Sequence, residues 1–150
     1  MRQQLEERIY STFAAIASSI GYNEVHGRVI AALLVTNKPL SLQELSKKTG
    51  YSLAAISLSL DLLELVGIIK KIKNQKDRKL YAKLDGDILE GLRNALIFKL
   101  QKEITATTIE LEQYKGTNDK KVRQAIGILE KEIKRLDKYV KSLSDVKIPK

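Results

Sequence analysis

Several residue types on which small proteins often rely are missing from this 150-residue chain. It has no cysteine and no tryptophan, only two prolines, and a single histidine, His26. Without cysteine there can be no disulfide, no thiol nucleophile and no zinc finger. One histidine makes a transition-metal site improbable, because such sites require several clustered ligands. The sequence therefore predicts a protein without metal or cofactor.

Long apolar runs and catalytic motifs are also missing. The longest apolar run, "VIAALLV", has seven residues, and the N-terminus "MRQQLEERIYSTF" lacks the apolar core of a secretory signal. No glycine-rich phosphate loop, GxSxG or HExxH motif is present. We expect a soluble cytoplasmic protein that has no membrane partner and is not an enzyme.

Positive charge is concentrated in one short segment. The net charge is +9, and residues 70–83 contain seven lysines and arginines against one acid, Asp77. Such a patch suggests a polyanionic partner. The alternative is a solvated hairpin, since lysines also protect exposed strand edges.

The first half of the chain has the pattern of four helices. Apolar residues recur every three or four positions in residues 5–20 and again in 25–34, and Gly21 separates the two segments. Ser41 and Glu44 form a capping box in "SLQE", and Ser52 caps the next helix after the break at Gly50.

After Gly67 the pattern changes from helix to strand. "IIKKIK" and "KLYAKL" each suit a strand, and "NQKDR" joins them into a basic hairpin. Helix, helix, tight turn, helix and hairpin is the order of a winged helix-turn-helix. The predicted fold is mainly α with a small β-hairpin wing, carrying N- and C-terminal dimerisation helices.

The C-terminal part predicts two long helices. A break at residues 116–118 separates them, and the second helix repeats apolar residues in heptads from Val122 to Leu143. Because the break is short, we expect the two helices to form an antiparallel hairpin. The heptad repeat is also long enough to leave apolar surface exposed on a monomer, which favours a homodimer. We expect three parts: a dimerisation helix over 1–22, a winged helix over 23–84 and a helical hairpin over 85–150. The expected dimerisation residues are Leu5, Ile9, Phe13, Ile16, Ile126, Leu129, Ile133, Leu136 and Val140.

The helix in the recognition position has an unusual composition. From Ser52 to Ile69 there is no arginine, lysine, asparagine, glutamine or histidine, the residue types that make most hydrogen bonds to base edges. Serines at 52, 57 and 59 can still bond phosphates or bases. Such a helix would position the protein rather than discriminate sequence. Leu58, Leu62 and Leu65 form a second apolar stripe, which is either buried or a surface for a protein partner.

Residues 21–81 resemble the MarR superfamily, in particular its GbsR-like branch. The matching features are Gly27-Arg28, "KPLSLQEL", "TGYS", Ser57, "LVGII" and "KDRKLY". The resemblance implies a dimeric regulator in which Ser52, Ala54, Ala55 and Ser57 face DNA. It also implies that Arg78 is the wing arginine, that Asp77 orients it, and that Arg28 lies near the DNA backbone. Members of this family often respond to small ligands, but no residues here name an effector.

The resulting hypothesis is a dimeric transcriptional regulator of double-stranded DNA, with helix 52–66 in the major groove and the basic wing 70–83 on the backbone or minor groove. Two alternatives stay open: a protein-interaction adaptor that uses the leucine stripe, and an architectural DNA binder of low specificity. The expected DNA-binding residues are Arg28, Ser41, Ser52, Leu53, Ala54, Ala55, Ser57, Leu58, Lys73, Lys76, Asp77, Arg78 and Lys79.

Overall fold

A computed structural model describes all 150 residues. The chain forms two compact units, Met1–Gly91 and Leu92–Lys150. No helix combines the length and the apolar character that crossing a membrane requires.

The first unit begins with two helices that approach each other closely. Helix α1 is Arg2–Ser19 and helix α2 is Glu24–Thr36, where the side chain of Asn23 caps α2 by accepting from the Val25 amide. A Cβ at Gly27 would lie 2.0 Å from the Phe13 carbonyl oxygen, so only glycine permits this contact. Helix α1 therefore belongs to the same compact unit as the winged helix, although the sequence set it apart as residues 1–22.

The helix-turn-helix follows the predicted caps. Helix α3 is Leu42–Thr49 and carries both halves of the Ser41–Glu44 capping box. Gly50 ends it at a φ of 79°, in the left-handed region that favours glycine. Helix α4 is Leu53–Leu65, and the Ser52 side chain accepts a hydrogen bond from the Ala55 amide.

A three-stranded antiparallel sheet completes the first unit. The strands are β1 (Leu40–Ser41), β2 (Ile69–Lys73) and β3 (Leu80–Leu84), arranged in the order β1-β3-β2. Strands β2 and β3 form the predicted wing, paired from Ile69 opposite Leu84 to Lys73 opposite Leu80. The two-residue strand β1 was not predicted. The core beneath the sheet is made by the fully buried side chains of Val29, Leu33, Leu40, Leu45, Ile56, Leu60 and Ile68.

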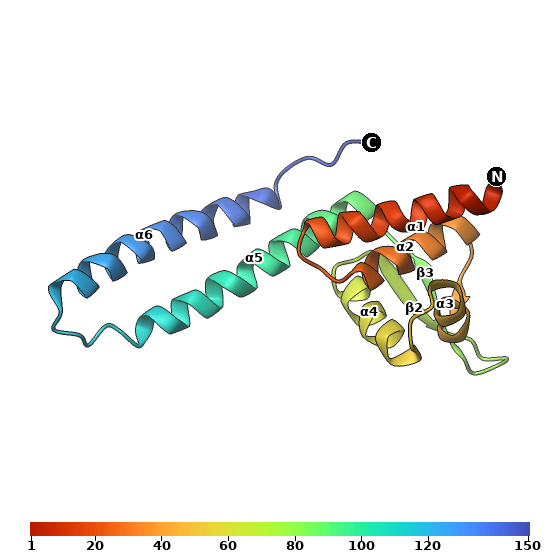
Figure 1. The fold of residues 1–150 in the computed structure, drawn as a ribbon, viewed down its shortest axis with the longest axis horizontal. Coiled ribbons are helices and arrows are strands. Elements are labelled where there is room, and N and C mark those ends of the chain that lie inside the picture. The colour runs from red at the N-terminus through yellow and green to blue at the C-terminus, as the bar shows by residue number, and fades with distance from the viewer. The chain divides into compact units, whose positions relative to one another are not determined.

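Two long helices form the C-terminal part (Figure 1). Helix α5 is Ile88–Glu112, preceded by Asp87, which accepts from the Leu89 and Glu90 amides. Helix α6 is Lys120–Leu143, capped by Asp119. Within the second unit α6 runs back along α5, and Lys115 in the turn after α5 forms an ion pair with Glu130 of α6 at 3.6 Å. The antiparallel hairpin expected from the short break is present.

Candidate nucleic-acid interface

The tip of the wing is a compact loop closed by its own backbone. Asn74 donates its amide to the Lys79 carbonyl at 2.9 Å, and the Arg78 amide donates to the Asn74 carbonyl at 2.8 Å. The Asn74 side chain also accepts from the Lys76 amide at 2.8 Å. Side-chain hydrogen bonds of this kind are why asparagine favours turns. The loop between β2 and β3 thus has a defined conformation.

Asp77 has partners that the sequence did not predict. Its carboxylate accepts from the Lys79 amide at 2.9 Å and from the Tyr81 hydroxyl at 2.7 Å. These bonds to Tyr81 and Lys79 lower the pKa of Asp77, and the same contact raises the pKa of Tyr81. The expectation that Asp77 holds the Arg78 guanidinium is wrong in this structure, where the carboxylate bonds the Tyr81 hydroxyl and the Lys79 amide and forms no ion pair with Arg78.

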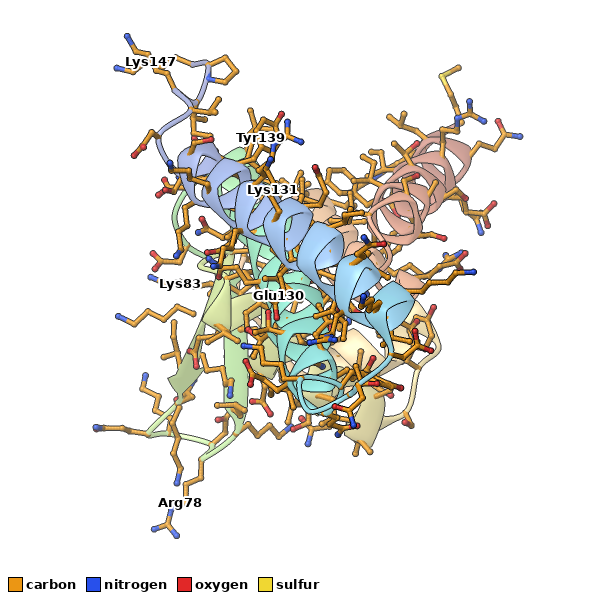
Figure 2. The ribbon with its side chains drawn as sticks, turned by 90° about the vertical axis from the view of Figure 1, so that its left-hand side faces the viewer. Arg78, Lys83, Glu130, Lys131, Tyr139 and Lys147 are labelled. Atoms are coloured by element: carbon orange, nitrogen blue, oxygen red, sulfur yellow. The ribbon has the colours of Figure 1, made fainter.

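Arg78 is left exposed at the end of the wing. Its φ is 60°, the left-handed conformation that non-glycine residues rarely adopt. Its side chain extends away from the sheet (Figure 2) and makes no hydrogen bond or ion pair within the chain. Together with Lys73, Asn74 and Gln75 it lines a shallow hollow of about 370 Å³. This surface offers unpaired cations and amides to a ligand and no carboxylate.

The exposed face of α4 is apolar. Leu53, Leu58 and Leu65 are 48%, 71% and 65% exposed, and Ser52, Ala54 and Ser57 are exposed with them. Leu62 is half-buried. The leucine stripe is therefore open on this chain and does not form part of the core.

The two acids of this helix share one cation from the neighbouring strand. Lys71 on β2 forms ion pairs with Asp61 and, at 3.7 Å, with Glu64. The bond to Asp61 is the main reason why the pKa of Lys71 is raised. Lys71 thus offsets one of the two negative charges that Asp61 and Glu64 place beside the wing.

Two of the serines considered for DNA contact lie in the interior. Ser41 is only 2% exposed, and its hydroxyl accepts from the Glu44 amide as the cap of α3. Ser59 is fully buried and its hydroxyl lies 2.8 Å from Nδ1 of His26. Their assignment to the DNA surface is corrected, because helix capping and the contact between α2 and α4 already use these hydroxyls.

His26 links α2 to α4 and was not predicted to have a structural partner. Its ring also lies edge-on to Tyr22, with centroids 6.0 Å apart. Burial lowers the pKa of His26. The sequence places His26 and Ser59 on two amphipathic helices. That placement alone does not predict that the two side chains form a hydrogen bond.

Arg28 lies in a polar cleft rather than on the wing surface. The cleft has a volume of about 420 Å³ and is lined from α1 by Glu6, Glu7 and Tyr10, and from α3 by Lys48. Lys48, in the last turn of α3, is the second cation of this cleft. Two acids of α1 share this cleft with the two cations, which makes it a mixed-charge site.

The expected dimerisation residues divide into two sets. Ile126 and Val140 are buried within the hairpin, so they hold α6 to α5. Leu129 and Leu136, the alternate seam positions of α6, are 49% and 39% exposed. On α1, Leu5 is 61% exposed, whereas Ile9 and Phe13 are half-buried.

Comparison with known proteins agrees with this architecture. No family model matches the chain. A solved structure of a transcriptional regulator superposes with a TM-score of 0.70 at 20% identity, covering 93% of both chains. The chain therefore shares the winged helix-turn-helix fold of that structure. The predicted fold, mainly α with a small β-hairpin wing, is confirmed, and membership of the MarR superfamily and of its GbsR-like branch stays a prediction.

Two further similarities were found. Transcription factor E of Nanoarchaeum equitans is 38% identical over 84 residues, which cover 56% of this chain. The match spans 58% of that relative, little more than half its length. The solved structure of MarR from E. coli has 20% identity and a TM-score of 0.43, covering 87% of this chain and 90% of that one.

Proposed function

We propose that this protein is a non-enzymatic DNA-binding transcriptional regulator that contacts the phosphate backbone mainly through its wing. The observation that carries the proposal is the tip of the hairpin, where Arg78 is exposed and unpaired while Asp77 is bonded to Tyr81 and Lys79. The nearby Lys73, Lys76 and Lys79 are exposed as well. Four free cations on one short hairpin suit a polyanion better than an isolated surface charge would.

Helix α4 would contribute less than the wing to DNA binding, because its exposed face is mainly apolar. Ser52 and Ser57 can donate to phosphates, and leucine or alanine can contact thymine methyl groups. The helix has no side chain for bidentate base recognition, so specificity would come in part from DNA shape. The similarity to transcription factor E and to a regulator fold supports a role in transcription.

The proposed assembly is a homodimer. The half-exposed Leu129 and Leu136 on α6 and the exposed Leu5 on α1 supply apolar surface for a second copy. A symmetric dimer that reads two half-sites would place its α4 helices about 34–36 Å apart. The three functional parts proposed are the helix of 1–22, the winged helix of 23–84 and the hairpin of 85–150.

The wing is tested by a double substitution, Lys76→Ala with Arg78→Ala. Each lost phosphate contact lowers the salt slope of binding by about 0.9, so the slope should fall by about 1.8. The assay is fluorescence anisotropy with a mixed-sequence duplex between low and moderate salt. The matched control is Lys38→Ala with Lys47→Ala, two exposed lysines outside the wing. An equal change in both variants would show that only net charge matters and would contradict the proposal.

A second candidate function is a protein-interaction adaptor that uses the leucine stripe. The exposures of Leu58 and Leu65, 71% and 65%, favour it, because large apolar side chains in a row on one helix commonly mark a binding surface. Replacing both leucines with serine avoids adding charge. If the protein is an adaptor, the double substitution should abolish partner binding while DNA affinity and the circular dichroism spectrum stay unchanged. If it is a DNA-binding regulator, the double substitution should weaken DNA binding.

A further inference from the structure

Helix α6 carries far more positive charge than the helix beside it. It has eight lysines and arginines against three acids, whereas α5 has three basic and four acidic residues. The excess on α6 was not apparent from the sequence, where the wing had the densest cluster of charge.

The cations of α6 lie on one face. At about 100° per residue, four lysines fall within roughly 60° of arc and span about 27 Å of helix axis. These four, the lysine stripe, are Lys120, Lys131, Lys134 and Lys138. All are exposed, and Figure 2 shows Lys131 on α6. They point away from the buried side of the helix, where Ile126 and Val140 lie.

The acids of α6 do not neutralise the lysine stripe. Glu132 pairs with Arg135 at 2.7 Å and Asp137 pairs with Lys141 at 2.9 Å. Glu130 pairs with Lys115, which also bonds Glu112. Every carboxylate of α6 thus has another cation as partner, and none of the four lysines of the stripe forms an ion pair.

The first turn of α6 carries an excess of positive charge. A helix N-terminus favours acidic side chains, because the backbone dipole is positive there. This helix instead begins with Lys120, Lys121 and Arg123 and has no acid in its first turn. The carboxylate at this end is that of the N-cap Asp119, which accepts from the Lys121 and Val122 amides. Three cations therefore surround a single carboxylate whose oxygen is already bonded to the backbone, and this end of the helix keeps an excess of positive charge.

We propose that the lysine stripe is a second binding surface for the phosphate backbone of duplex DNA, an inference that rests on the proposed DNA-binding function. Gln124 and Gly127 lie between the lysines of the stripe, and the exposed Ile128 and Tyr139 lie along one of its sides. A helix that lies on a lipid surface has a continuous apolar face beside its cations, and two separated side chains do not form one. A row of unpaired lysines fits a regularly charged backbone contacted without base recognition.

The test compares three variants of the full chain in the same salt titration with duplex DNA. The stripe variant is Lys131→Gln, Lys134→Gln and Lys138→Gln. A control with the same net charge is Lys102→Gln, Lys147→Gln and Lys150→Gln, three exposed lysines outside α6. The stripe variant should lower the salt slope by about 2.7, from three contacts at about 0.9 each, and the control by less than about 1.

The wing variant Lys76→Ala with Arg78→Ala separates failure of this inference from failure of the proposed function. A loss in the wing variant with none in the stripe variant overturns the inference and leaves the function standing. A loss in the stripe variant alone supports the inference and contradicts the role of the wing. If the stripe variant loses binding to vesicles of anionic phospholipid but keeps its DNA affinity, the surface serves a membrane and the inference is overturned. Circular dichroism spectra confirm that each variant is folded.

Discussion

The contact between α1 and α2 can be tested by adding one methyl group. In Gly27→Ala the new Cβ would lie 2.0 Å from the oxygen and 2.4 Å from the carbon of the Phe13 carbonyl. These are backbone atoms, so no side chain can rotate away and the two helices must separate by more than about 1 Å. A gap of that size removes a quarter to a half of each dispersion contact across it. Overpacking of this kind costs about 1–3 kcal/mol, and we expect about 3 because the clash is with backbone.

The chain supplies a control in which the same substitution has the opposite sign. Gly127 is an exposed position within α6, and a Cβ there would meet nothing within 4 Å. Gly127→Ala should therefore stabilise the protein by about 0.5–1 kcal/mol, because alanine has the higher helix propensity.

Both changes are measured by urea unfolding followed by circular dichroism, since the chain has no tryptophan to report by fluorescence. Hydrogen exchange on α1 amides localises the effect of Gly27→Ala. If that variant loses less than about 0.5 kcal/mol and α1 amides keep their protection, α1 does not pack on α2 as described. The helix would then be free to act as a separate arm.

Two further predictions concern the wing and the single histidine. Tyr81→Phe removes the hydroxyl that bonds Asp77 but changes no charge. DNA affinity in anisotropy titrations should therefore fall severalfold while the salt slope stays constant. Unchanged affinity would mean that this bond does not order the wing. Burial lowers the pKa of His26 below its ordinary 6.5, so between these two values the unfolded chain binds more protons than the folded one. The stability that neutral His26 provides is thus present above pH 6.5 and lost as the pH falls through the folded pKa. Urea midpoints from pH 5 to 8 should show this loss in the wild type and not in His26→Asn, and equal curves would place the pH dependence in another group.

Much of the fold was predictable because local signals agreed with each other. The capping box at Ser41, the cap at Ser52 and the left-handed Gly50 each specify a helix end through contacts within a few residues. The β-hairpin of the wing likewise followed from alternation and a polar turn. Strand β1 was missed because two residues carry no periodicity, and they form a strand only by pairing with Tyr81 and Ala82 far along the chain.

The candidate site was predictable in position but less so in detail. The cluster of charge located the wing, whereas the partner of Asp77 depends on the loop conformation that brings the Tyr81 hydroxyl within 2.7 Å. Burial of Ser59 against His26 needed the crossing of α2 and α4, which no local pattern gives. The lysine stripe became evident only once the bounds of α6 and its ion pairs were known.

The most direct test of the central claim is the affinity of the wild-type protein for a mixed-sequence duplex as a function of salt, with selection of bound fragments alongside. We predict measurable binding at low salt, and a logarithm of affinity that falls linearly with the logarithm of salt concentration. Enrichment of a palindromic site would add support for a dimeric regulator. The absence of binding at low salt would contradict the account, and the exposed leucines of α4 would then be the surface on which to seek a protein partner.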